Sequence, residues 1–177
     1  MKTLYLERST GESRSGNWVA GLELDGVERI VVGIGPGSFA GIRSALAFAQ
    51  GFALAKKGCE VLGLPSACAL ADGGKLAVIG DARRGKFWIA QFDGYELECD
   101  VRQVDADALR SAVPADYRVV TPDFARIDAL LRETFASRYI GGATPTDEGL
   151  RRFAEKNPAI LRREPLPIYL NPAVRDN

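Results

Sequence analysis

The residues most suited to chemistry gather where a predicted strand meets a predicted helix, in the sequence GIGPGSFAG. Gly33, Gly35 and Gly37 allow positive φ and close backbone approach at this turn. Ser38 can cap the following helix, whose free N–H groups then point back toward the turn. The arrangement is typical of a phosphate-binding turn and equally typical of a tight structural turn. The candidate cofactor contacts are therefore Gly35, Gly37 and Ser38.

Neither common phosphate-binding motif is complete at this turn. Gly35, Gly37 and Ala40 fit the dinucleotide fingerprint G-x-G-x-x-G/A, but Glu60, at the expected distance, opens its strand instead of closing it. The P-loop pattern fails because no Lys-Ser/Thr pair follows the turn. A stand-alone nucleotide-binding enzyme that uses the Gly33–Ser38 turn stays open as one hypothesis, beside a purely structural turn.

A second cluster of polar residues, Asp81, Arg83, Arg84 and Gly85, has no assigned role. Asp81 would stand at a strand end, where a carboxylate can bind a metal ion. The plainer interpretation is a charged turn in which Asp81 accepts a hydrogen bond from its own backbone. We favour the turn, because Glu7 is the one other acidic residue placed to complete a metal site.

Residue types that are absent exclude several kinds of chemistry. The chain has no histidine, which excludes Ser-His-Asp and Cys-His nucleophile pairs and metal sites that use histidine. Its three cysteines have no CxxC spacing, which argues against zinc sites and structural disulfides. We therefore assign no catalytic residue, no metal ligand and no cofactor, and expect no enzymatic activity of the chain's own.

Charge and hydropathy limit the partners. The 177 residues carry 23 Lys and Arg against 23 Asp and Glu, so no broad field attracts nucleic acid or an anionic membrane. The first ten residues lack the apolar run of a signal peptide, and the apolar stretch at 42–55 is too short to cross a bilayer. We expect a cytoplasmic protein without strong direct nucleic-acid binding.

The elements that must position these residues alternate between strand and helix. After a strand at 2–7, Asn17 to Leu24 reads as a half-buried strand, and Asp25-Gly26 predicts a hairpin that returns Val27 to Ile34 antiparallel. A helix follows from Ser38 to about Lys57, closed by Gly58. The later elements are strands at 60–62, 75–80, 86–92, 95–101, 118–120 and 138–140, helices at 65–71, 105–112, 123–135 and 146–156, and an extended, proline-rich tail. These elements predict an α/β fold with two related halves, 1–73 and 74–177.

The helix after the glycine turn is apolar on more than half of its circumference, which requires burial on two sides. Its own sheet can cover one side, and a partner chain is a strong candidate for the other. We assign the partner interface to Ile42, Ala45, Phe48, Ala49 and Phe52. The proline-rich residues 158–172, folded back over this face, are the competing cover.

Four stretches resemble the TsaB (YeaZ) family. IGPGSFAGIRSALAFAQGFALA is similar to the family's GPGSFTGLR-type motif and helix, LYLERST to its opening strand, VIGDARRGKFWIAQF to its DARRGEVY strand pair, and EPLPIYLNPAV to its closing segment. The resemblance implies an actin-like ATPase fold made of two RNase H-like halves. It also implies a non-catalytic partner in bacterial threonylcarbamoyladenosine modification of tRNA, next to the anticodon, which binds a TsaD-type catalytic paralogue and an ATPase subunit. From the apolar helix itself we expect a homodimer in isolation, because symmetric pairing is the commonest outcome for such a patch. The absence of histidine argues against the family's older glycoprotease label.

The chain departs from the family pattern at several positions. Glu7 and Arg8 replace an Asp and a Thr, and Ala40 replaces a Thr. The family has a long helix before the strand at Arg29, where this chain leaves only two residues after the predicted turn. We therefore expect a truncated first half with a barer Phe48 and Phe52 face. A family relic that only self-associates is the remaining alternative.

Overall fold

The computed structural model describes residues 1–10 and 18–170, which form two compact units. Unit 1 consists of Met1–Ala69 and Pro145–Ile168, and unit 2 of Leu70–Thr144 with the chain from Tyr169. The sequence prediction divided the chain near the same first junction but kept everything after it in the second half. In the structure the segment 145–168 instead packs with unit 1, where one of its helices contacts the first strand.

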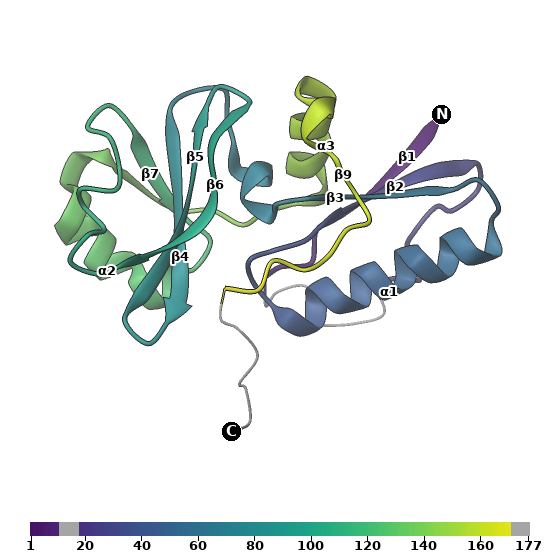
Figure 1. Cartoon of the computed structure of the whole chain (residues 1–177), viewed down its shortest axis with the longest axis horizontal. Helices are drawn as coiled ribbons and strands as arrows, with labels where there is room; N and C mark the ends of the chain where they lie inside the picture. The colour runs from purple at the N-terminus through teal and green to yellow at the C-terminus, as the bar shows by residue number, and fades with distance from the viewer. Residues whose placement is uncertain (11–17, 171–177) are drawn as a thin grey trace. The chain divides into compact units, whose positions relative to one another are not determined.

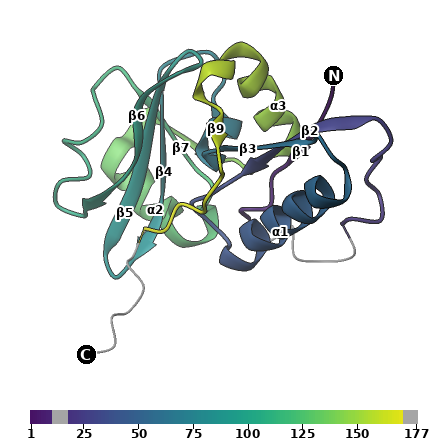
Figure 2. The same ribbon diagram turned by 45° about the vertical axis from the view of Figure 1, so that its right-hand side comes forward.

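Unit 1 is built on a four-stranded sheet with two helices (Figure 1). The strand order is β1-β2-β3-β9, in which β1, β2 and β3 are parallel and β9 is antiparallel to β3. Helices α1 and α3 lie on opposite faces of this sheet in both views (Figures 1 and 2). The bounds are β1 Lys2–Leu6, β2 Val27–Gly33, α1 Phe39–Ala55, β3 Glu60–Leu64, α3 Asp147–Lys156 and β9 Arg162–Arg163.

Helix α1 begins as the sequence predicts. Ser38 has extended backbone angles, and its side chain accepts a hydrogen bond from the N–H of Gly41, which satisfies one of the free donors of the first turn. The helix ends at Lys56, whose N–H bonds to the carbonyl of Phe52. Gly58, predicted to close the helix, lies two residues further on with φ +87°.

The predicted hairpin before β2 is wrong. Residues 18–26 form turns, and β2 pairs in parallel with both β1 and β3, so neither of its edges is open to an antiparallel neighbour. The apolar alternation that suggested a strand has another cause, because Trp18 and Leu22 pack on the core of unit 1 from this irregular segment. Asn17, where the predicted strand begins, lies outside the described residues.

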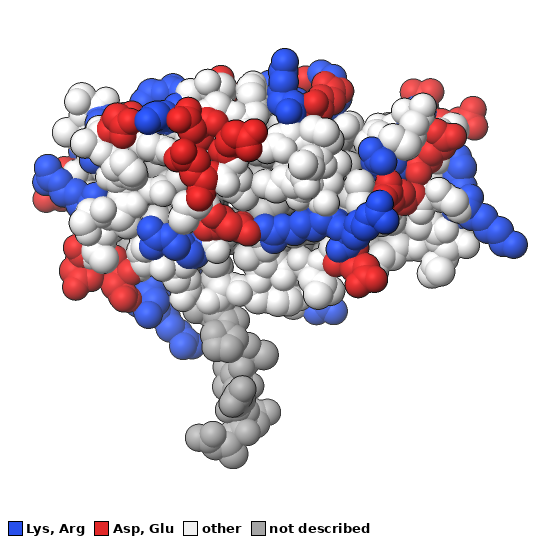
Figure 3. Space-filling model, turned by 45° about the horizontal axis from the view of Figure 1, so that its top comes forward, with Lys and Arg blue, Asp and Glu red and all other residues white. Residues whose placement is uncertain are grey.

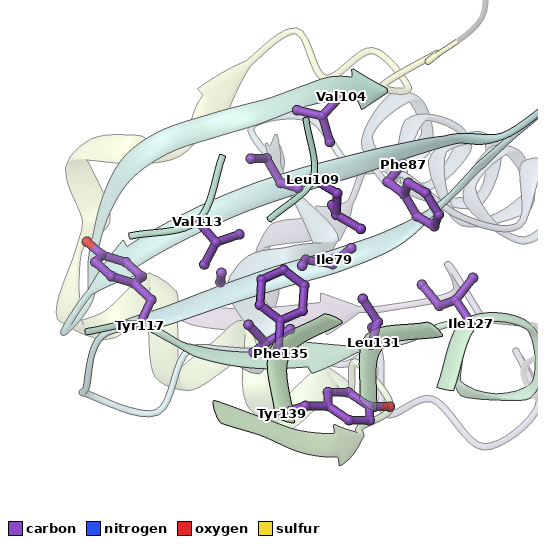
Figure 4. Packing of buried hydrophobic residues seen from close by; sticks show 13 residues of the cluster. Ile79, Phe87, Val104, Leu109, Val113, Tyr117, Ile127, Leu131, Phe135 and Tyr139 are labelled. Carbon is purple, nitrogen blue, oxygen red and sulfur yellow. The ribbon is translucent and has the colours of Figure 1, made fainter. Parts of the chain in front are cut away.

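Unit 2 contains a five-stranded sheet in the order β6-β5-β4-β7-β8. The first three strands are antiparallel neighbours, and β7 and β8 run parallel to β4. Helix α2 packs on this sheet over a core that is centred on Ile79, Leu131 and Phe135 (Figure 4). The bounds are β4 Leu76–Arg83, β5 Lys86–Asp93, β6 Glu96–Asp105, β7 Arg118–Thr121, α2 Phe124–Phe135 and β8 Tyr139–Gly142.

The α/β class and the strands of unit 2 are confirmed, but the helix predicted at 105–112 is wrong. Strand β6 continues to Asp105, and successive turns follow, with bonds such as Ala108 N–H to the carbonyl of Asp105. These turns bury Leu109 and Val113 in the core, so the apolar spacing that suggested a helix is satisfied without one.

The tail after Asn157 contains more structure than the sequence predicts. A short 3₁₀ turn, Pro158–Ile160, precedes β9, which pairs with the edge of β3. Ile168 then donates its N–H to the carbonyl of Ile34 at 2.8 Å. Residues 158–168 therefore run beside β3 and the glycine turn.

Candidate functional site

The backbone N–H and carbonyl groups of the glycine-rich turn after β2 form hydrogen bonds with other residues of the same chain. The N–H of Gly35 donates to Ser66 Oγ at 2.9 Å, and the N–H of Ser38 donates to the carbonyl of Ser9. The carbonyl of Gly35 accepts from the N–H of Ser66 at 2.8 Å. A phosphate at Gly35 or Ser38 would have to displace these bonds, each of which already satisfies a backbone donor.

Two glycines are required here because the end of β1 lies against the start of α1. A β-carbon at Gly37 would stand 2.2 Å from the carbonyl oxygen of Ser9, and one at Gly41 would stand 1.9 Å from that of Arg8. Real β-carbons do not approach so closely. The sequence pattern thus indicated close backbone approach correctly, but the approaching group is the chain's own backbone.

Glu7 is the most unusual ionisable residue of this region. It is only 2% exposed and follows β1 directly. Its Oε1 accepts the N–H of Ser9 at 2.6 Å, whereas its Oε2 has no hydrogen-bond partner among the residues that the structure describes. Burial raises the pKa of Glu7 above its usual value, the polar contacts with Ser9 and Ser66 act in the opposite direction, and the carboxylate of Asp147 raises it further.

Arg8 connects α3 with the end of β1. Its guanidinium grips Asp147 through two bonds, Nη1 to Oδ1 at 2.7 Å and Nη2 to Oδ2 at 3.2 Å. Asp147 also accepts the N–H of Glu7 at 2.5 Å. On its other side Arg8 lies 4.9 Å from the centre of the Trp18 ring, which meets Phe48 edge to face at 5.4 Å. Sequence reasoning missed this cluster, because no local signal links residues almost the whole chain apart.

The predicted partner interface is only partly accessible. Ile42, Ala45 and Ala49 belong to the core between α1 and its own sheet, with 3%, 0% and 0% of their surface exposed. Phe48 and Phe52 are half-buried, and their rings stack with centroids 6.3 Å apart. Three of the five predicted contacts are therefore out of a partner's reach in this structure.

The face of α1 that points away from the sheet is different from the one predicted. Its ends are marked by two exposed apolar residues, Phe39 at 54% and Leu54 at 86%. Between them the exposed positions are mostly small or polar: Ala40, Arg43, Ser44, Ala47, Gln50 and Gly51. We call this set of residues the outward face of α1. Its signal in the sequence is the recurrence of small residues at helical spacing.

The Asp81 cluster in unit 2 forms a charged turn, as the sequence indicated. Oδ1 of Asp81 accepts the N–H of Arg83 at 2.8 Å, and Oδ2 pairs with Nε of Arg126 at 3.1 Å. The turn itself runs through Arg83, Arg84 and Gly85 with φ of 69°, 55° and 73°. Across the described ranges, no group of three or more His, Cys, Asp or Glu side chains is arranged to hold a metal ion.

Charge is mixed over the surface. Figure 3 shows Lys and Arg beside Asp and Glu over the face in view, so no single-sign field covers it. Within the part of the chain that the structure describes, no helix has the length and apolar character needed to span a membrane.

Comparisons with known proteins agree with this architecture. A family model described as TsaD, tRNA N6-adenosine threonylcarbamoyltransferase, matches residues 19–138. Two solved structures are similar over almost their whole length: YeaZ from Pseudomonas aeruginosa, with a TM-score of 0.69, 21% identity and coverage of 94% of this chain and 99% of that one, and an uncharacterized protein with similarity to peptidase YeaZ from Pseudomonas aeruginosa, with a TM-score of 0.70, 20% identity and coverage of 96% and 99%. No curated protein matches the chain. The likeness to the solved structures establishes a YeaZ-type fold, and the family match, which spans about two thirds of the residues, shows that the chain belongs to the TsaD family.

Proposed function

We propose that this chain is a non-catalytic partner subunit in the threonylcarbamoyladenosine modification of tRNA. On this proposal it acts in the cytoplasm by binding a TsaD-type catalytic paralogue, together with an ATPase subunit of the same assembly. Membership of the TsaD family supports the pathway. Two observations favour a non-catalytic role. The chain has no histidine, and the N–H groups of Gly35 and Ser38 in the glycine turn already donate hydrogen bonds within the chain.

The observation that carries the proposal is the outward face of α1. The helix is held firmly by Ile42, Ala45 and Ala49, which bury its other side. Its outward side combines small residues, which let another helix approach closely, with apolar Phe39 and Leu54 at the two ends. Burial of one such large side chain contributes about 1.5–3 kcal/mol, so the two together correspond to a factor of at least about 100 in the dissociation constant.

The same face offers a second copy of the chain a self-complementary surface. We propose that it forms a symmetric homodimer when the catalytic paralogue is absent, because closed twofold pairing is the commonest outcome for such a patch. Binding of the paralogue and self-association would then compete for one surface.

The experiment uses a double variant, Phe39→Asp with Leu54→Asp. We expect it to remain folded, because both side chains are exposed, and to bind the purified paralogue at least about 100-fold more weakly in calorimetry. The matched control is Phe124→Asp, which places a charge at an equally exposed phenylalanine on α2, and it should bind like the unmodified chain. Equal loss of binding in control and double variant, or no loss in either, would rule out this surface.

A further inference from the structure

The carboxyl group of Glu7 is enclosed after the end of β1, against β2 and Ser66, and next to the residues that contact the start of α1. A β-carbon at Gly33 would lie 1.9 Å from Oε2 and 2.9 Å from Ser66 Oγ, so the carboxyl occupies the space over the glycine. Among the described residues, Oε1 accepts the N–H of Ser9 and Oε2 has no hydrogen-bond partner, while the side chains of Ser9 and Ser66 act to lower the pKa of the carboxyl. The group is thus almost fully buried and only half satisfied.

The charges around Glu7 do not favour its ionised form. From α3, Asp147 presents a second carboxylate, which accepts the N–H of Glu7 itself. The adjacent residue in the chain, Arg8, directs its guanidinium at Asp147 and at the carbonyl of Glu7. From the 3₁₀ turn Ser66–Leu70 and from β2, the neighbours are Ser66 and Gly33, which carry no charge. No ion pair of Glu7 occurs among the described residues.

A buried carboxylate without a cation loses its hydration, and the contacts with Ser9 and Ser66 offset that loss less than burial imposes it, whereas the neutral acid avoids the cost and brings an O–H donor. We propose that Glu7 is a neutral carboxylic acid in the folded protein and that its ionisation is a pH-sensitive switch after the end of β1, against β2. The ligand that controls this switch is therefore a proton, bound by the Glu7 carboxyl.

Ionisation would act on the start of α1 through two short links. The carbonyl of Ser9 accepts the N–H of Ser38, the residue that caps the helix, and the carbonyl of Arg8 lies against Gly41. A charged carboxyl that draws in water must move away from Gly33 and from the N–H of Ser9. A shift of the backbone at Ser9 then loosens the first turn of the helix. An effect on partner binding would rest on the proposed function, but the switch itself does not.

The sign of the pH dependence follows from the raised pKa of Glu7. Below about pH 4.5, its usual value, the acid is protonated in both the folded and the unfolded chain. As the pH rises from there to the folded-state pKa, the unfolded chain loses its proton first, so stability falls. Because one proton is released, the equilibrium constant for unfolding rises at most about tenfold per pH unit across this window.

The test compares urea unfolding of the full chain with that of Glu7→Gln, a neutral side chain of nearly the same shape, from about pH 4.5 to 8. We expect the two to be similar at the acid end and Glu7→Gln to become progressively more stable than the unmodified chain as the pH rises. The control is Glu133→Gln, which removes an exposed carboxylate from α2 and should keep a constant difference. A constant difference for Glu7→Gln as well would overturn the proposal.

A second measurement remains decisive if Glu7→Gln does not fold. The ¹³C resonance of the Glu7 side-chain carboxyl, followed by NMR in the unmodified chain, should keep the shift of the protonated acid well above pH 4.5. A carboxyl that titrates at or below pH 4.5 would show that Glu7 is ionised in the fold and would refute the switch. Neither experiment involves the catalytic paralogue. A result that refutes the Glu7 switch is therefore distinct from one that refutes the proposed function.

Discussion

Two glycines in α1 should respond in opposite ways to the same substitution. Gly41 lies at the first turn of the helix, where a β-carbon would stand 1.9 Å from the carbonyl oxygen of Arg8 and 3.1 Å from its carbonyl carbon. Gly51 lies on the outward face, where a β-carbon would meet nothing within 4 Å. Neither residue has a positive φ, so backbone strain does not enter the comparison.

The expected magnitudes follow from these distances. Alanine is favoured over glycine inside a helix by about 1 kcal/mol, so Gly51→Ala should stabilise the chain by about that amount. At Gly41 the obstructing atoms are backbone, which cannot rotate away, and the helix or β1 must shift by more than 1 Å to restore the 3.0 Å that real β-carbons keep. Overpacking of this kind costs about 1–3 kcal/mol or more, which outweighs the gain in helix propensity.

The assay is thermal and urea unfolding followed by circular dichroism. In a chain of this size, 1 kcal/mol corresponds to a change of about 2–4 °C in Tm, so Gly51→Ala should melt higher and Gly41→Ala lower than the unmodified protein. If Gly41→Ala were as stable as Gly51→Ala, the contact between the end of β1 and the start of α1 would not exist as described, and the account of the glycine turn would be wrong.

Two further predictions concern the turn and unit 2. ATP and ADP should bind the isolated chain weakly or not at all and should not be hydrolysed, because Gly35 and Ser38 already donate to Ser66 and Ser9; micromolar affinity in calorimetry would contradict this and favour the nucleotide-binding enzyme. Burial, and then a hydrogen bond to Asp128, raise the pKa of Tyr139 to about 12, so its phenol should stay mostly un-ionised at pH 11. The difference between spectrophotometric titrations of the unmodified chain and Tyr139→Phe measures this, and a titration near 10 would show that the ring is not buried and bonded as described.

Local signals in the sequence were sufficient for many elements of the fold. Ser38 followed by a long apolar stretch predicted α1, and Thr146 followed by acidic residues predicted α3, because caps and helix periodicity act within a few residues. The strands predicted at 86–92 and 95–101 correspond to β5 and β6, because the alternation of apolar and polar residues is also a local signal.

Long-range pairing could not be derived in this way. Asp25-Gly26 has the composition of a hairpin turn, yet β2 is parallel to β1 because both of its edges are filled by distant segments. Periodicity also showed that α1 is apolar on more than half of its circumference, but not which side meets the sheet. Ile42 and Ala45 were therefore assigned to a partner although the core of unit 1 already buries them.

The sequence indicated a tight glycine turn before α1, but not the segments that the turn contacts. The glycines marked a close backbone approach, whereas the identity of the approaching segment, Arg8 and Ser9, depends on how β1 ends beside α1. The contact between Arg8 and Asp147 joins residues 139 positions apart, beyond any local pattern.

The most direct test of the central claim is a calorimetric titration of this chain with the purified TsaD-type paralogue, alone and with Phe39→Asp and Leu54→Asp combined. The account predicts a defined complex with the unmodified chain and a dissociation constant at least about 100-fold higher for the double variant, whose circular dichroism should be unchanged. An unmodified chain that binds no paralogue, or a double variant that binds it equally well, would contradict the claim that the outward face of α1 is a docking surface.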